Sequence, residues 1–343
     1  MIRQQKKAAY ASDREAQYDE RAKKVTGSKI VIASILSKTV DAFRGMKPRE
    51  IVPYIEGEPY IGSVPVEPGK TNASYTENGK RIVGFNTENQ EENEGLARFD
   101  VICYVRLPEK GSKAAAGNGR AARAKCRATV SGRKGPLTQI IINIEIQKDQ
   151  PHTYKILNRA VFYVSRQISS QKERDFVKSH YDDIKSVYSI WICMNMEENS
   201  LCHIHLTKED IIGNKQWGGN PDLFHIIMIG IGKELPEHTE IYELHRLLGT
   251  LFSKELGRKD KIGILKEEYD ITEDDNLGED VSEMCNLSQG IKEDGIAIGR
   301  KDGIAIGETG LIQNMHKNGF TAEQIAAATD KDLEDVKAIL RNK

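Results

Sequence analysis

The sequence predicts an α/β protein in which helices flank a mixed β-sheet and a helical tail follows at the C-terminus. Apolar residues recur at helical spacing over 18–43. Segments 97–105 and 187–194 are rich in β-branched and aromatic residues, which is typical of strands. Beyond residue 290, glycines repeat every four residues and helix-capping residues follow, which indicates separate helical elements.

The first helix is expected from Tyr18 to Phe43, after a polar lead-in at residues 1–17. Pro48 marks its end, because the residue before a proline avoids the helical region. The other expected elements are a helix at Thr153–Ser170, strands at Leu201–Leu206 and Leu223–Ile231, and a helix at Glu240–Leu256.

One strand carries an unusual polar pattern, I-N-I-E-I-Q-K-D at residues 142–149. Successive side chains of a strand point to opposite faces, so Asn143, Glu145 and Gln147 share one face. Two interpretations are open. The strand is either half-exposed in an antiparallel sheet, or its carboxylate binds a metal with a partner two residues further on.

The C-terminal part divides into three predicted segments. Residues 257–289 form an acidic, loop-like linker, and residues 290–315 form a helix built on the repeat DGIAIGRK–DGIAIGET. Residues 316–343 form a small helix-turn-helix-like module, in which Thr321 and Gln324 have the spacing of a capping box. Its second helix is acidic, so protein contact or simple capping is as well supported as DNA reading.

Composition leaves the partner open. The 343 residues carry 50 basic and 51 acidic side chains, so the net charge of −1 neither favours nor excludes nucleic acid. No apolar run approaches a membrane span, and the N-terminus lacks the apolar region of a secretory signal. The five cysteines show no CxxC pairing, so we expect reduced thiols and a cytoplasmic protein.

Basic residues concentrate in segment 106–136, which holds nine of them against the single acid Glu109. The segment is either a loop that gathers DNA or a solvated connection between strands. Its candidate phosphate contacts are Arg120, Arg123, Lys125 and Arg127.

Asp100 and Glu145 provide the pattern that metal-dependent phosphodiester hydrolysis requires. Mg²⁺ is commonly held by one or two carboxylates together with waters and substrate phosphate. An acid on one strand and an acid-x-polar pair on its neighbour supply such a site, and Gln147 shares the face of Glu145.

These residues belong to an ordered set of motifs. The set is YDERAKKVTGSKIVIASILSKTV, RFDVICYV, NIEIQKD, YKILNRAVFYVSRQISSQ, YDDIKSVYSIWICMN and MCNLSQGI. Over nearly the whole chain, the sequence resembles the bacterial PD-(D/E)XK nuclease family transposases, which are related to recombination-promoting nucleases. The resemblance implies a restriction-endonuclease-like domain at residues 18–256, with 106–136 as an insertion. It further implies a Mg²⁺- or Mn²⁺-dependent endodeoxyribonuclease linked to a mobile element or to recombination.

The resemblance also implies residue roles. Asp100 and Glu145 match the metal-binding acids, and Gln147 stands where many nucleases of this fold have a lysine. A lysine offers positive charge to the reacting phosphate or water, and glutamine does not. A further acid is expected from Glu56 or Glu20, and the sequence does not decide between them.

Several other side chains are candidates for a role at the site or in the core. Arg159, Tyr163 and Arg166 fall on one stripe of the Thr153–Ser170 helix and either contact DNA phosphates, pair with Asp100 or Glu145, or face solvent. The stretch Cys202–His205 invites a zinc site, but no second ligand cluster accompanies it, so we predict none. Trp191 and Trp217 are expected in the core.

The alternative function is a catalytically inactive DNA-binding or assembly protein on the same fold. The glycine-repeat helix favours homo-oligomerisation, because four glycines on one stripe allow another backbone to approach closely.

Overall fold

The computed structural model describes residues 16–62, 74–77, 80–83, 88–89, 97–108, 138–272 and 277–341. Two compact units divide the chain. One spans residues 18–285, and the other combines residues 1–17 with 286–343.

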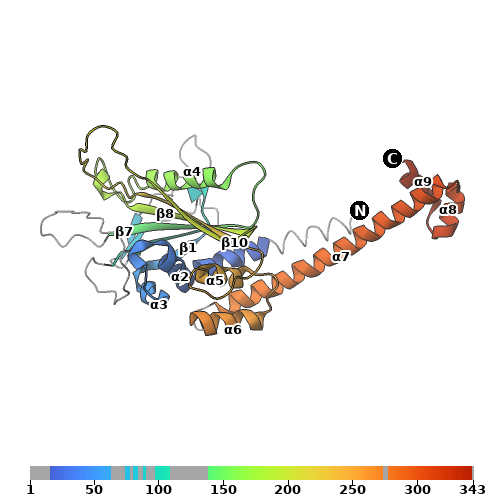
Figure 1. Cartoon of the computed structure of the whole chain (residues 1–343), viewed down its shortest axis with the longest axis horizontal. Helices are drawn as coiled ribbons and strands as arrows, with labels where there is room; N and C mark the ends of the chain where they lie inside the picture. Colours follow the sequence, from blue (N-terminus) through green and yellow to red (C-terminus); the bar gives the residue numbers. More distant parts are fainter. Residues whose placement is uncertain are drawn as a thin grey trace. The chain divides into compact units, whose positions relative to one another are not determined.

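A six-stranded mixed sheet forms the centre of the 18–285 unit (Figure 1). Its strand order is β1-β6-β7-β8-β10-β9. The β7–β8 and β8–β10 pairs are parallel and the remaining pairs are antiparallel, which confirms the predicted α/β class with a mixed sheet. The strands are β1 (Ile55–Ile61), β6 (Val101–Arg106), β7 (Gln139–Gln147), β8 (Ser186–Met196), β9 (Ser200–His205) and β10 (Phe224–Gly232). Four shorter strands pair outside it: β2 (Ser74–Glu77), β3 (Lys80–Val83), β4 (Glu88–Asn89) and β5 (Ala97–Arg98).

Helices cover both faces of this sheet (Figure 1). On one face lies α4 (Ile156–Ser169), the crossover that parallel strands β7 and β8 require. Its Ala160, Tyr163 and Val164 pack into a buried cluster with Ile141 and Trp191. The other face carries α2 (Lys29–Thr39) and α5 (Glu243–Phe252), with the short α3 (Pro48–Ile51) beside α2.

Strand β7 is buried on both of its faces. Ile140, Ile142 and Ile144 are at most 1% exposed, and on the opposite face Asn143 and Glu145 are 0% and 2% exposed. The half-exposed interpretation of this strand is therefore wrong, because α4 covers the face that carries the polar residues. The strand is partly exposed only at its ends, at Gln139 and at Ile146 and Gln147.

The expected first helix is divided into two. Residues 16–27 are helical, the helix breaks at Ser28, and α2 continues to Thr39. At the break, a Cβ on Gly27 would lie 2.8 Å from the Ile61 Cδ1 atom of β1. Glycine thus lets the N-terminal helix approach the sheet closely, just where β1 meets the start of β6.

The prediction that residues 257–289 form a loop-like acidic linker is wrong. This segment contains α6 (Arg258–Tyr269) and the start of α7 (Gly278–Lys317), and it buries Leu265, Ile271 and Leu277. Charged residues surround these few apolar positions, so the helical pattern is weak in the sequence.

The C-terminal unit confirms the predicted helices. The glycine repeat lies within α7, and α8 (Ala322–Thr329) and α9 (Leu333–Arg341) follow. Thr321 and Gln324 form the capping box, with the Gln324 backbone N–H donating to Thr321 Oγ1 at 3.3 Å. Ile312, Ile325 and Val336 make a small core between the three helices.

The two tryptophans differ in their environment. Trp191 is fully buried, as expected, whereas Trp217 is 78% exposed and lies beneath the Lys215 ammonium, so its predicted core position is wrong. None of the helices in the described part of the chain combines the length and apolar character that a membrane crossing needs.

A substitution at Gly27 tests the close approach of the N-terminal helix. We expect Gly27→Val to lower the free energy of unfolding by roughly 1–3 kcal/mol, because its side chain overlaps Ile61. Gly263→Ala, in α6 with open space around the new Cβ, is the matched control and should stabilise by up to about 1 kcal/mol. Urea denaturation measures both, and equal effects of the two variants would contradict the packing.

Candidate active site

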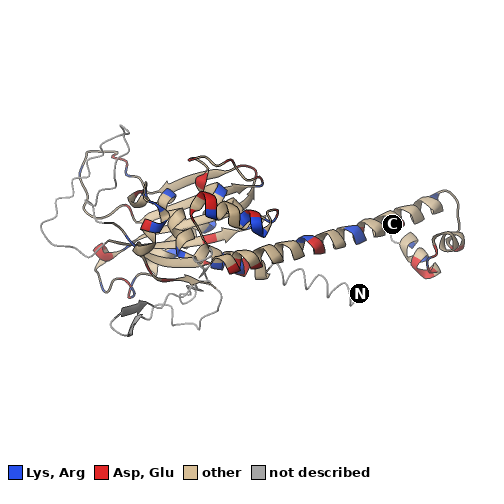
Figure 2. Ribbon diagram, turned by 90° about the horizontal axis from the view of Figure 1, so that it is seen from below, with Lys and Arg blue, Asp and Glu red and all other residues tan. Residues whose placement is uncertain are grey.

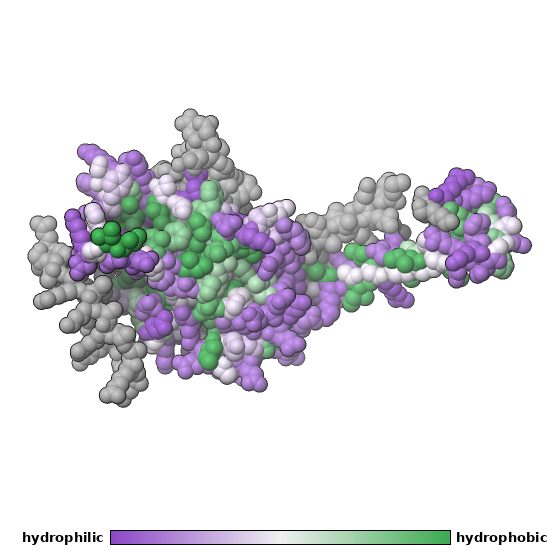
Figure 3. All heavy atoms as spheres, turned by 45° about the horizontal axis from the view of Figure 1, so that its top comes forward, coloured by the Kyte–Doolittle hydropathy of each residue, from purple (hydrophilic) through white to green (hydrophobic). Residues whose placement is uncertain are grey.

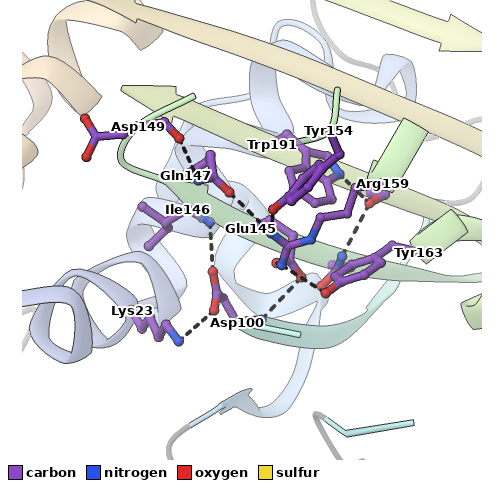
Figure 4. A network of polar contacts seen from close by, with 12 residues as sticks. Lys23, Asp100, Glu145, Ile146, Gln147, Asp149, Tyr154, Arg159, Tyr163 and Trp191 are labelled. Atoms are coloured by element: carbon purple, nitrogen blue, oxygen red, sulfur yellow. Dashed lines mark hydrogen bonds and ion pairs between the residues drawn. The ribbon is translucent and has the colours of Figure 1, made fainter. Parts of the chain in front are cut away.

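Asp100 and Glu145 lie side by side, although 45 positions separate them in the sequence. Antiparallel pairing of Val101 with Ile144 places Asp100 opposite Glu145 at the next position. The Asp100 backbone N–H donates to Glu145 Oε1 at 3.3 Å, and the Ile146 N–H donates to Asp100 Oδ2 at 2.9 Å (Figure 4). The structure therefore brings together the two acids that the sequence singles out.

Glu145 is a buried carboxyl group beside a second carboxylate. Burial raises the pKa of Glu145 well above its ordinary value, and the charge of Asp100 raises it further. Arg159 and hydrogen bonds from Asn143 and the Asp100 backbone act in the opposite direction without cancelling the rise. In this setting an added cation would favour the ionised form of Glu145, so cation binding here would be coupled to loss of its proton.

A lysine that the sequence prediction missed lies at the site. Lys23, on the helix of residues 16–27, places its Nζ 2.7 Å from Asp100 Oδ1 (Figure 4). The only sequence signal was its place in the motif YDERAKK, on a helix that buries Tyr18, Ala22 and Val25. That pattern does not predict that Lys23 pairs with Asp100.

On the other side of Glu145 stands Arg159 of α4. Its guanidinium lies 3.9 Å from Glu145 Oε2 and donates to Gln147 Oε1 at 3.3 Å. It also donates to the hydroxyl oxygens of Tyr154 and Tyr163, at 3.0 and 2.9 Å, and lies over the Tyr163 and Trp191 rings. These contacts favour the interpretation that Arg159 pairs with Glu145 over the interpretation that it contacts a DNA phosphate.

Gln147 has its amide group engaged at both ends. The side-chain nitrogen donates to the Asp149 carbonyl oxygen at 2.7 Å, and the oxygen accepts from Arg159. The amide lies beside the carboxylate pair as predicted, and it brings no charge there.

Tyr163 and Arg166 do not present a DNA-binding surface. They are 8% and 5% exposed, because this stripe of α4 faces the sheet. The expectation that they contact DNA phosphates is wrong for the described structure. Arg120, Arg123, Lys125 and Arg127 lie outside the described residues.

Neither candidate for a further acid joins the pair. Glu56 is opposite Tyr104 in the β1–β6 register and forms an ion pair with Arg106 at 2.7 Å, several residues along the strand from Asp100. That position contradicts its expected role. Glu20 is on the same helix as Lys23, but it is about half exposed and pairs with Lys24 at 3.3 Å.

The donor set fits a divalent cation that keeps part of its hydration. Within the described ranges, no group of three or more His, Cys, Asp or Glu side chains is arranged to hold a metal ion. Two carboxylates are enough for Mg²⁺ or Mn²⁺ when waters and a substrate phosphate complete the shell.

Comparison with protein families, with characterised proteins and with solved structures produced no match for this chain.

The raised pKa of Glu145 makes a prediction about stability. The folded protein binds this proton more tightly than the unfolded chain, so the contribution of Glu145 to stability is fully present at acidic pH and is lost as the pH rises through its native pKa. We expect Glu145→Gln to unfold later than wild type at pH 8 but not at pH 5, with a difference on the order of 1 kcal/mol.

Denaturation of both proteins at the two pH values measures this effect. Glu20→Gln, at a half-exposed glutamate, is the control and should show the wild-type pH dependence. If Glu145→Gln keeps the wild-type dependence as well, Glu145 does not hold a raised pKa.

Proposed function

We propose that this chain is a Mg²⁺- or Mn²⁺-dependent DNA endonuclease of the PD-(D/E)XK restriction-endonuclease-like fold, acting in the cytoplasm in connection with a mobile element or recombination. The observation that supports it most is the adjacent pair Asp100 and Glu145, with Gln147 beside them. The antiparallel β6–β7 pair and the parallel β7–β8 pair with its α4 crossover are compatible with that fold.

In this proposal Asp100 and Glu145 hold the cation. When bound, the cation would polarise a phosphoryl oxygen and lower the pKa of an attacking water. Gln147 orients that water or a phosphate oxygen through its amide. Hydrolysis joins the water oxygen to phosphorus and breaks one phosphorus–oxygen ester bond. The products are a phosphomonoester and a hydroxyl group, and a proton ends on the departing oxygen.

DNA binding has weaker support from the described residues. Lys and Arg are interspersed with Asp and Glu over the described ribbon (Figure 2), and this fits the net charge of −1. The proposal therefore assigns much of the phosphate attraction to the basic segment 106–136, most of which lies outside the described residues.

Plasmid cleavage with Mg²⁺ tests the enzyme directly. We expect Asp100→Ala and Glu145→Ala to lose about 10³-fold or more in rate, because both carboxylates act through the cation on the transition state. Glu56→Ala, at the acid that lies away from the pair, should keep the wild-type rate within a few-fold. Equal nicking by all four proteins would show that the pair has no part in cleavage.

A second function also has a specific observation in its favour. Lys23 and Arg159 already flank both carboxylates, as in a site that needs no metal. The alternative proposal is a catalytically inactive DNA-binding or assembly protein. Salt-sensitive DNA binding without metal-dependent cleavage would support it.

Assembly has its own structural support in α7. In the described part of the chain, and apart from the helix's own adjacent backbone, no atom lies within 4 Å of a Cβ added at Gly295, Gly299, Gly303 or Gly307. Isoleucines between them are 40–72% exposed, at positions 296, 298, 304 and 306, and Figure 3 shows hydrophobic residues at the surface of this helix. Each interior glycine costs a helix about 1 kcal/mol, so we propose that a second copy packs here and stabilises it.

The oligomeric state tests that packing in the full chain. Ile304→Asp with Ile306→Asp should lower the mass measured by light scattering to that of the monomer, because these residues flank the glycine stripe on its two sides and charge on both sides opposes close association. Lys301→Asp, on the same helix, is the control and should keep the wild-type mass. A monomeric wild-type protein would exclude assembly through α7.

A further inference from the structure

Lys23 reaches the carboxylate pair from a well-anchored helix. The buried residues Tyr18, Ala22 and Val25 fix the helix of residues 16–27 against the domain. The Tyr18 hydroxyl donates to the Phe252 carbonyl oxygen at 2.8 Å, and Gly27 permits close contact with Ile61. Lys23 is therefore held at the site, with its side chain 29% exposed and open to exchange with solvent or ligand.

Among the described residues that the contacts above place at the site, Lys23 is the cation best suited to turn to a new partner. Gln147, at the position where a lysine would provide charge, is neutral and engaged with Asp149 and Arg159. Arg159 is held by two tyrosine hydroxyls and two aromatic rings, and its guanidinium approaches Glu145 only to 3.9 Å. Lys23 makes a closer contact, 2.7 Å, and makes it with Asp100.

The flexible side chain of lysine suits a group that changes partner. Its ammonium is a compact charge on a four-carbon stem, so it can move a few ångströms while its helix stays fixed. A divalent cation on Asp100 would compete for the oxygen that Lys23 occupies. The ammonium would then be displaced toward the space where a phosphate oxygen binds.

We propose that Lys23 supplies, from the N-terminal helix, the positive charge that glutamine cannot provide at position 147. Without a divalent cation, Lys23 neutralises Asp100. With cation and DNA present, its ammonium contacts a non-bridging oxygen of the reacting phosphate and stabilises the charge that develops there. Lys23 takes no part in bond making. The role on the phosphate rests on the proposed nuclease function, whereas the neutralising role does not.

Titration with Mn²⁺ alone, without DNA, tests the neutralising role. We expect Lys23→Met to bind Mn²⁺ about tenfold more tightly than wild type, because a competing cation is removed from Asp100. Lys23→Arg should keep the wild-type affinity, and so should Lys24→Met, which alters the neighbouring surface lysine paired with Glu20. Unchanged or weaker affinity in Lys23→Met would overturn this role, since a purely structural lysine predicts one of those results.

Single-turnover cleavage at saturating DNA and Mg²⁺ tests the phosphate role. We expect Lys23→Met to lower the rate about 10²-fold while DNA affinity in Ca²⁺ changes little. Lys23→Arg should retain most of the rate, and Lys24→Met all of it. The double variant Lys23→Met with Gln147→Lys places the positive charge at position 147 instead of position 23. It should recover part of the lost cleavage rate, which a structural role for Lys23 would not predict.

The outcomes separate the two proposals. If wild type cleaves and Asp100→Ala does not, a wild-type rate in Lys23→Met overturns the role of Lys23 and leaves the nuclease intact. If wild type does not cleave, the nuclease and the phosphate role fail together, and the Mn²⁺ titration still decides whether Lys23 neutralises Asp100.

Discussion

The apposition of two carboxylates, one of them buried, is the constraint on which the site depends. Glu145 is 2% exposed and hydrogen-bonds to the backbone of Asp100, so two like charges meet where water cannot separate them. Such an arrangement persists only when protons or cations compensate it. Here Lys23 pairs with Asp100 and Arg159 lies near Glu145, while burial and the charge of Asp100 raise the pKa of Glu145.

The surrounding fold holds those two cations in place. The α4 crossover between the parallel strands β7 and β8 covers the polar face of β7 and brings Arg159 over the Tyr163 and Trp191 rings. The N-terminal helix approaches β1 through Gly27 and brings Lys23 to the open end of the same strand pair. Four segments that are distant in sequence thus converge on one carboxylate pair, with Figure 4 showing their side chains together.

Much of the fold follows from local pattern, because helix and strand periodicities depend on near neighbours. The alternation in β7 placed Glu145 and Gln147 on one face, and the β6 pattern placed Asp100 beside a strand end. Three features depend on long-range packing, which no local pattern contains. They are the burial of that face, the pairing of Lys23 with Asp100, and the register that separates Glu56 from the carboxylate pair. The α6 helix was missed because charged residues surround its few buried apolar positions, and Trp217 because aromatic character alone does not imply burial.

The proposed nuclease requires that a divalent cation can replace the Lys23 ammonium at Asp100 and favour the ionised form of Glu145, whose pKa burial raises. Calorimetry of Mn²⁺ binding at mildly acidic pH, in two buffers of different ionisation enthalpy, measures this replacement directly. Binding at the pair should release up to about one proton per cation in wild type and none in Glu145→Gln. Mn²⁺ binding with equal proton release in both proteins would contradict a cation site at Asp100 and Glu145, and so would the absence of binding.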